Sequence, residues 1–77
     1  MPVSGIVVRC RDGCADAVAE RIAAFEGVEV HGVLPDGQIV AVVEADSVQG
    51  EVDIVSQLHD VEDVITVRLA YHNFEDV

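Results

Sequence analysis

Residues 37–44 read Gly-Gln-Ile-Val-Ala-Val-Val-Glu, and this run decides the fold. Residues 39–43 are all apolar and mostly β-branched, a composition that suits a pleated strand with apolar neighbours on both faces. The preceding Pro35-Asp36-Gly37 joins a residue of fixed φ to a residue that tolerates positive φ, as a chain reversal requires. We therefore predict a central strand that is entered through a tight turn.

The rest of the chain divides into three further strands and two helices. Alternation of apolar and polar residues predicts strands over 4–10, 28–34 and 64–72, and recurrence every three to four residues predicts helices over 13–25 and 47–59. The element order is therefore βαββαβ, and the tight turn makes the second and third strands a hairpin. Two right-handed crossovers that meet at a hairpin give an α+β, ferredoxin-like split βαβ fold.

This fold predicts a four-stranded antiparallel sheet in the order 4-1-3-2 with both helices on one face. A chain of 77 residues buries about 60% of the surface that its unfolded form exposes, which is enough for one modest core. We therefore expect residues 1–77 to form a single domain.

Polar residues beside the predicted helices indicate where each begins. Asp12 is the expected N-cap of the first helix, and Gly27 is expected to end it. Asp46 is the expected N-cap of the second helix, with Gln49 in the capping-box position. The predicted buried stripes are Cys14, Val18, Ile22 and Phe25 in the first helix and Val48, Val52, Val55 and Leu58 in the second.

Period-two alternation assigns each strand residue to one of two faces of the sheet. One face is apolar throughout and is expected under the helices; it comprises Ile6, Val8, Val28, Val30, Ile39, Ala41, Val43, Ile65, Val67 and Leu69. The other face has no helix to cover it; it comprises Gly5, Val7, Arg9, Glu29, His31, Val33, Gln38, Val40, Val42, Glu44, Thr66, Arg68, Ala70 and His72.

Three valines lie at the centre of the uncovered face. Val7, Val40 and Val42 form an apolar strip with charged residues around it, which is typical of an interaction surface. The alternative is that valine occurs there for its β-propensity alone.

The formal net charge is −11, from 15 acidic residues and four arginines. Such a chain repels nucleic acid and anionic membrane surfaces and attracts a basic partner. Solubility of a small domain, or a salt-rich cytoplasm, explains the same acidity without any partner.

Cysteine and histidine give no pattern typical of a reactive site. Cys10 and Cys14 are separated by three residues rather than two, and both positions suit small buried side chains. The three histidines fall on separate elements and lack metal-ligand spacing. We therefore expect no metal, no cofactor and no enzymatic activity.

The position and length of the apolar stretches indicate the cellular location of the protein. A strand-like run begins as early as Ser4, so we expect no cleaved leader, and no apolar stretch approaches the ~20 residues of a membrane span. The prediction is a cytoplasmic protein with reduced cysteines.

The order and spacing of four stretches resemble the NapD family. They are Ser4-Gly5-Ile6-Val7-Val8, Ala24-Phe25-Glu26-Gly27-Val28-Glu29-Val30, Gly37-Gln38-Ile39-Val40-Ala41-Val42-Val43-Glu44-Ala45, and Leu69-Ala70-Tyr71-His72 followed by acidic residues. The resemblance covers nearly the whole chain, and Glu26 departs from the proline expected there. It implies a ferredoxin-like cytoplasmic chaperone that binds the twin-arginine signal peptide of the periplasmic nitrate reductase catalytic subunit, NapA. Export would then be delayed until the molybdenum cofactor is inserted.

The uncovered face suits such a partner, because valines accept an apolar segment and carboxylates pair with guanidinium groups. The predicted peptide-binding residues are Val7, Arg9, Glu29, Val40, Val42, Glu44, Arg68 and His72. The protein itself is expected to be a monomer or weak dimer. Two alternatives remain at this point: a small-molecule-binding regulatory module of ferredoxin-like fold, and a metal carrier, which the cysteine spacing disfavours.

Overall fold

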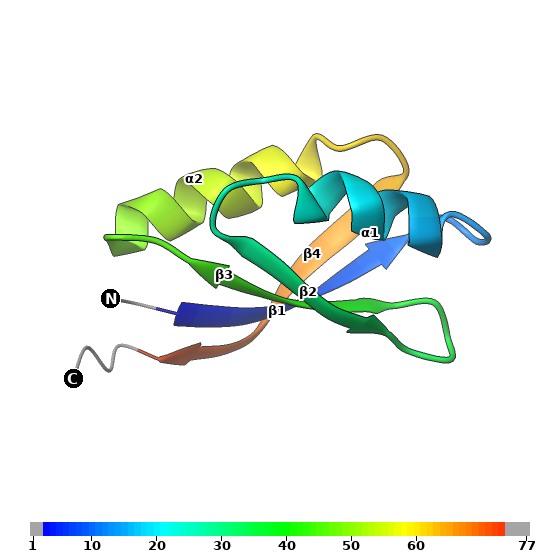
Figure 1. Cartoon of the computed structure of the whole chain (residues 1–77), viewed down its shortest axis with the longest axis horizontal. Helices are drawn as coiled ribbons and strands as arrows, with labels where there is room; N and C mark the ends of the chain where they lie inside the picture. Colours follow the sequence, from blue (N-terminus) through cyan, green and yellow to red (C-terminus); the bar gives the residue numbers. More distant parts are fainter. Residues whose placement is uncertain (1–2, 74–77) are drawn as a thin grey trace.

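Four strands and two helices follow one another in the order βαββαβ (Figure 1). The computed structural model describes residues 3–73, with the side chains of 3–70. The elements are β1 (Val3–Cys10), α1 (Ala15–Ala23), β2 (Val28–Val33), β3 (Ile39–Glu44), α2 (Val48–His59) and β4 (Val64–Asn73). Both helices lie over one face of the sheet, and the opposite face carries no helix (Figure 1). The predicted ferredoxin-like architecture is confirmed.

The sheet is antiparallel and has the strand order β2-β3-β1-β4, which is the predicted order. Strand β3 is central, and Ile39, Ala41 and Val43 are fully buried on its helix side. The turn before it is also as predicted: Gly37 adopts a φ of +88°, and its N–H donates to the Leu34 carbonyl at 2.8 Å.

The core lies between the sheet and the two helices. Its fully buried apolar side chains are Ile6, Val8, Val18, Ile22, Ile39, Ala41, Val43 and Leu58. Each buried Val, Leu or Ile side chain stabilises the fold by roughly 1.5–3 kcal/mol relative to exposure, so this cluster is the main stabilising feature. Within the described residues, no helix is long and apolar enough to cross a membrane.

Helix α1 begins two residues later than predicted, and Asp12 does not cap it. Its N-cap position is Cys14, whose side chain makes no capping hydrogen bond. The reason is Gly13, which has a φ of +80° and therefore cannot be part of a right-handed helix. The predicted stripe is correct, because Val18 and Ile22 are fully buried and Phe25 packs against them.

Helix α2 is capped by Ser47, not by Asp46. The Ser47 hydroxyl accepts a hydrogen bond from the Gly50 N–H at 3.0 Å, three residues into the helix. Gln49 makes no capping box; its side-chain amide donates to Asp53 at 3.0 Å. The prediction of this cap was wrong by one residue, because two adjacent polar residues both suit the position.

The buried stripe of α2 also differs from the prediction. Val48 and Val52 are 41% and 53% exposed, while Glu51 is only 3% exposed. The Ser4 hydroxyl of β1 donates a hydrogen bond to Glu51, which satisfies part of the hydrogen-bonding capacity of this buried carboxylate. The helix is thus rotated so that Glu51 and Leu58 face the sheet.

Two bulges in β4 change which of its residues face the core. Val64 pairs with Cys10 and Thr66 pairs with Arg9, so Ile65 is the extra residue and is 54% exposed. Val64 takes the inward place that was predicted for Ile65 and packs against the core.

The second bulge in β4 is at Ala70, because Ile6 pairs with Leu69 and Gly5 pairs with Tyr71. Leu69 faces the helix side as predicted, yet it is 56% exposed because β4 is an edge strand that α2 covers only in part.

Strand β2 has a bulge at His31. Val30 pairs with Ala41 and Gly32 pairs with Val40, so His31 has no partner in the ladder. Beyond this bulge the alternation is reversed. Gly32 therefore lies on the uncovered face, and Val33 lies on the helix side, opposite to the prediction for Val33.

Candidate binding face of the sheet

The valine strip lies along the two central strands. Val7 pairs with Val40, Val42 pairs with Gly5, and all three valines are half-buried. The strip is flanked by glycine, because Gly5 lies beside Val42 and Gly32 lies beside Val40. Gly5 is buried, whereas Gly32 is exposed and a Cβ there would meet nothing within 4 Å, so a partner can approach the backbone closely at Gly32.

One end of the strip is acidic. Glu29 and Glu44 are both exposed, and together with Gly27, Val28 and Val42 they line a shallow hollow of about 440 Å³. Glu29 pairs across the strands with Val42, so a carboxylate stands directly beside the apolar strip. The acidic residues are therefore placed as the sequence predicted.

Gly27 holds the start of β2 close to the end of β3 at the acidic end of the strip. It has a φ of +86°, and its carbonyl accepts a hydrogen bond from the Glu44 N–H at 2.8 Å. A Cβ at this position would lie 2.5 Å from the Glu44 carbonyl oxygen, which no side chain tolerates. The close approach of Gly27 is what brings the start of β2 against the end of β3.

Glu29 already has a partner on its own strand. His31 Nε2 lies 3.0 Å from Glu29 Oε1, and the two side chains are 52% and 78% exposed. Exposed pairs of this kind contribute little stability, so the Glu29 carboxylate can exchange His31 for a guanidinium group at low cost.

The other end of the strip is basic. Arg68 pairs with Val7, and Arg9 pairs with Thr66, so the two exposed arginines are diagonal neighbours across β1 and β4. Among the residues whose side chains are described, neither arginine forms an ion pair. The face therefore has opposite charges at its two ends.

One acidic residue lies near the basic end. The pKa of the Asp36 carboxyl is lowered, chiefly by the hydrogen bond from the Gln38 side chain, and the charge of Arg9 adds a small effect in the same direction. Asp36 also accepts from the Gln38 N–H at 3.1 Å, so it is engaged within its own turn.

Seven of the eight predicted site residues lie on this face. The eighth, His72, belongs to β4 and pairs with Ser4, a helix-side position, so the register does not put it on the uncovered face as predicted. Its side chain is outside the described residues, and its role in binding stays a prediction. The bulge at Ala70 breaks the alternation on which its placement depended. Sequence reasoning missed the contributions of Gly27 and Gly32, although an isolated glycine next to a strand pattern is a signal for close backbone approach.

The cysteines lie elsewhere, at the end of β1 and the start of α1. Burial, followed by the nearby Cys14 thiol, raises the pKa of Cys10 above its usual range. The Cys10 thiol lies 3.7 Å from the Gly37 carbonyl oxygen. Among the described residues, no group of three or more His, Cys, Asp or Glu side chains could hold a metal ion.

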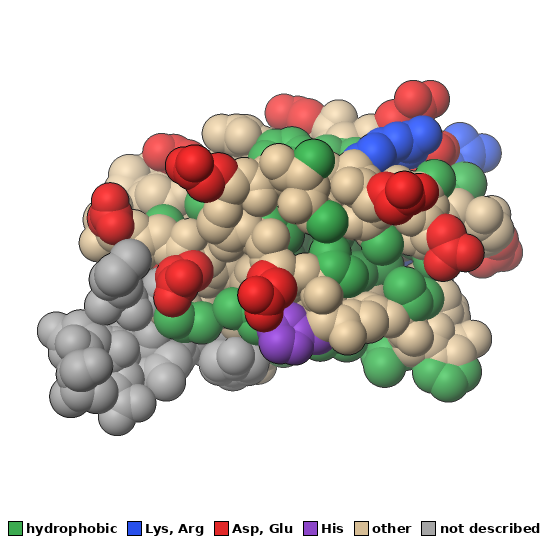
Figure 2. Space-filling model, viewed as in Figure 1, with side chains coloured by type: hydrophobic (Ala, Val, Ile, Leu, Met, Phe, Trp, Pro, Cys, Tyr) green, Lys and Arg blue, Asp and Glu red, His purple; other side chains and the backbone are tan. Residues whose placement is uncertain are grey.

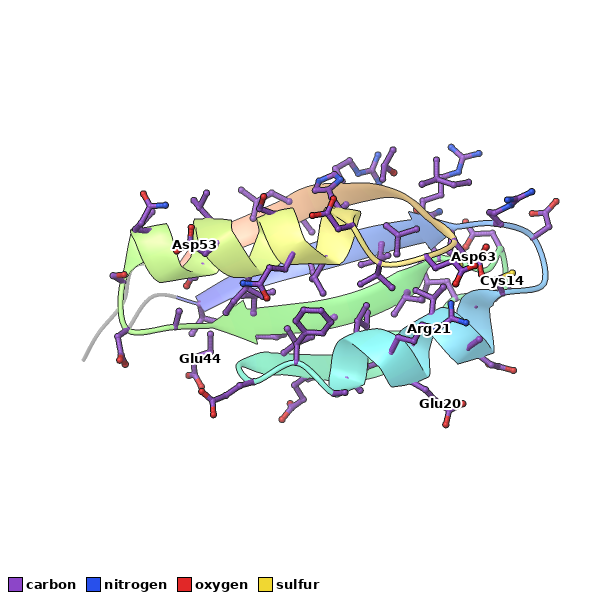
Figure 3. All side chains as sticks on the ribbon, turned by 90° about the horizontal axis from the view of Figure 1, so that it is seen from above. Cys14, Glu20, Arg21, Glu44, Asp53 and Asp63 are labelled. Carbon is purple, nitrogen blue, oxygen red and sulfur yellow. The ribbon has the colours of Figure 1, made fainter. Side chains whose placement is uncertain are left out.

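Among the charged side chains on the rest of the surface, acidic ones are more frequent than basic ones, as Figure 2 shows for one side. In the described residues, the one Arg–carboxylate ion pair is Arg21–Asp63 at 3.3 Å, which links α1 to the loop before β4. Figure 3 shows this pair and Cys14 at the opposite end of the molecule from Glu44.

A split βαβ sandwich with a helix-free, charge-rimmed sheet face is a small ferredoxin-like domain. Comparison with known proteins gives its family. The family model described as NapD protein matches residues 1–76, so the chain belongs to the NapD family.

Individual relatives agree with this assignment. Chaperone NapD of Escherichia coli K12 is 31% identical over 75 residues, which cover 96% of this chain and 86% of the relative, and the Shigella flexneri protein matches equally. The solution structure of the E. coli Tat proofreading chaperone NapD superimposes with a TM-score of 0.84 at 31% identity, over 96% of this chain and 79% of that one.

A crystal structure from Thermus thermophilus is similar with a TM-score of 0.85 at 26% identity, over 100% and 98% of the two chains. The fold is thus shared along the whole chain. The family gives this chain the role of a NapD chaperone, which acts on a partner protein.

Proposed function

We propose that this chaperone binds the twin-arginine signal peptide of the periplasmic nitrate reductase catalytic subunit, NapA, on the uncovered face of its sheet. Binding takes place in the cytoplasm and delays export until the molybdenum cofactor is inserted. The role is one of recognition and not of catalysis. The observation that carries the proposal is the apolar strip with two exposed carboxylates at one end.

The chemistry of the face matches that of the leader. A twin-arginine leader has adjacent guanidinium groups followed by an apolar segment. Arginine pairs with carboxylates through charge-assisted and often bidentate hydrogen bonds, which Glu29 and Glu44 offer. Val7, Val40 and Val42 offer the apolar surface beside them, and burial of this surface supplies affinity.

The first test is a titration of the full chain with the synthetic leader of its cognate reductase, by calorimetry. A second leader has both arginines replaced by lysine. We expect the arginine leader to bind at least tenfold more tightly, because lysine cannot make the bidentate contact. Equal affinity for both leaders, or binding of neither, would refute the proposal.

The second test places the site on the protein. Val42→Asp puts an unpaired charge into the apolar strip, and we expect it to weaken binding more than tenfold. The matched control is Val52→Asp, which alters an exposed valine on α2, away from the proposed face. If both variants bind alike, the site is elsewhere.

A third variant tests the acidic end. Glu44→Lys reverses one charge beside the hollow, and we expect a clear loss of affinity. Glu20→Lys makes the same change on the exposed side of α1 and should leave affinity nearly unaltered (Figure 3). An equal loss in both variants would mean that only the overall charge of the protein matters.

A further inference from the structure

We propose that Cys10 and Cys14 form a reversible redox pair: glutathione disulfide oxidises the two free thiols to an intramolecular disulfide, and a dithiol reductant restores them. The pair lies between β1 and α1, at the opposite end of the molecule from Glu44, and the proposal does not depend on leader binding (Figure 3). The reduced pair is the form that a reducing cytoplasm maintains, and a rise in glutathione disulfide produces the oxidised form.

A tight turn separates the two cysteines. Cys10 is the last residue of β1, and Cys14 directly precedes α1. Between them, the Cys14 N–H donates to the Arg11 carbonyl at 3.0 Å, and Gly13 has the positive φ of +80° that the third residue of a type II turn requires. Such a turn holds its first and fourth Cα atoms within about 7 Å of each other. Cys14 is therefore carried back toward the end of the strand, which is the approach that a disulfide between Cα atoms about 4.4–6.8 Å apart requires.

Both thiols belong to the same part of the core. Each cysteine side chain is half-buried and packs against the buried apolar cluster between the sheet and the helices. The Cys14 thiol is also the largest cause, after burial, of the raised pKa of Cys10, ahead of the carboxylates of Asp63 and Asp12. Electrostatic effects of this kind fall with distance, so the two thiols are neighbours in the folded chain.

The thiols are held by weak contacts. Cys10 Sγ lies 3.7 Å from the Gly37 carbonyl oxygen, and a thiol is a weak hydrogen-bond donor. The Cys14 side chain makes no capping hydrogen bond at the start of α1. Rotation of the two side chains toward each other therefore costs little.

The Cys10 thiol is open to a small reagent with negative charge. Cys10 lines a surface hollow of about 460 Å³ together with Arg9, Arg11, Asp12 and Ile65. Glutathione disulfide carries net negative charge at neutral pH, and the two exposed guanidinium groups in this lining outnumber the one carboxylate. Cys10 is therefore the thiol that reacts first.

The oxidation takes two exchange steps. The Cys10 thiolate attacks one sulfur of glutathione disulfide, which joins Cys10 to one glutathione and expels the other glutathione as a thiolate. The Cys14 thiolate then attacks the Cys10 sulfur, which joins the two cysteines and expels the second glutathione. The two protons given up by the cysteines are taken up by the two departing thiolates. The cysteine pair loses two electrons, and glutathione disulfide gains them.

The test is intact mass spectrometry of the folded full chain after incubation with excess glutathione disulfide. The reaction is run at mildly alkaline pH, because the raised pKa of Cys10 leaves little thiolate at neutral pH. We expect a monomer whose mass is lower by two hydrogen atoms, and we expect dithiothreitol to restore the original mass.

Two serine variants test the order of the steps. Cys14→Ser lacks the second nucleophile, so it should stop at the mixed disulfide and carry one glutathione on Cys10. Cys10→Ser lacks the thiol that lines the hollow, so it should take up glutathione more slowly than Cys14→Ser. Equal rates of uptake by the two variants would overturn the assignment of Cys10 as the first thiol.

The wild-type chain decides the proposal even where a variant fails to fold. A stable glutathione adduct, a disulfide-linked dimer or an unchanged mass would each overturn it. Formation of the intramolecular disulfide only in the presence of urea would also overturn it, because the folded turn would then hold the two thiols apart.

Discussion

Single residues in tight places decide the local geometry of this protein. Gly27 is the clearest case, because its positive φ and its contact with the Glu44 carbonyl oxygen both exclude a side chain. Gly37 has nearly the same φ, yet a Cβ there would meet nothing within 4 Å. A comparison of substitutions at Gly27 and Gly37 therefore separates the cost of positive φ from the cost of a steric clash.

This comparison gives a stability prediction. Gly37→Ala should cost about 1 kcal/mol in the free energy of unfolding, which is the cost of positive φ for an L-residue. Gly27→Ala should cost about 3 kcal/mol or more, because the start of β2 must also move away from β3. Urea denaturation of both variants measures the difference, and equal costs would contradict the contact.

The second residue-scale prediction concerns the acidity of Cys10. Burial is the largest cause of the raised pKa of Cys10, and the nearby Cys14 thiol is the second. Cys14→Ser removes the second cause, so it should lower the pKa of Cys10 toward its usual value. Asp16→Asn, which alters a residue outside those causes, should leave it unaltered. The pH dependence of iodoacetamide alkylation at Cys10 measures this pKa.

The raised pKa of Cys10 also determines how the stability of the protein changes with pH. A raised pKa means that the folded state holds the thiol proton more tightly than the unfolded state. The contribution of Cys10 to stability is therefore complete below the unfolded pKa and is lost as the pH rises through the folded pKa. Cys14→Ser should reduce this loss at alkaline pH.

At the scale of single elements, helix α2 shows that the residue that caps a helix and the residues that face the sheet are determined by different contacts. The Ser47 hydroxyl binds the Gly50 N–H, whereas Asp46 makes no such contact. We expect Ser47→Ala to cost about 1 kcal/mol of stability and Asp46→Ala much less. Urea denaturation of the two variants checks this, and the opposite ranking would restore Asp46 as the cap.

The contact between α2 and β1 is polar at Ser4 and Glu51. Ser4→Ala removes a donor to a buried carboxylate, so we expect a loss of about 1–3 kcal/mol in the free energy of unfolding. Ser56→Ala removes an exposed hydroxyl from the same helix and should alter stability by a few tenths of a kcal/mol at most. Similar thermal shifts for both variants would mean that the buried contact contributes nothing.

At the scale of the whole molecule, charge governs encounter. The net charge of −11 attracts a basic leader from a distance, and dissolved salt screens this attraction. Raising the ionic strength from about 0.05 M to about 0.5 M should therefore slow association of the arginine leader severalfold. The dissociation rate should be much less sensitive. Stopped-flow kinetics measure both rates, with a leader that has glutamine in place of both arginines as the less salt-sensitive control.

The local sequence pattern was sufficient to predict the features that depend on neighbouring residues. The strand at 37–44, the hairpin before it and the order of elements follow from runs of β-branched residues and turn residues, which act over a few neighbours. The valine strip was predictable because β1 and β3 are paired without a break from Val3 to Val8. The residues of the strip were therefore assigned to the correct face of the sheet where the alternation is undisturbed.

The tertiary structure decided what depends on partners far apart in the sequence. Bulges at His31, Ile65 and Ala70 arise from the fit between twisted edge strands and their neighbours, and each reverses an alternation that is locally regular. The rotation of α2 depends on which of its sides reaches the sheet, so Glu51 is buried and Val52 exposed. The sequence by itself determined the elements and their order, since these depend on neighbouring residues. Only the packed sheet decided the polarity of its uncovered face, because charges on four strands share a surface only after the strands pair.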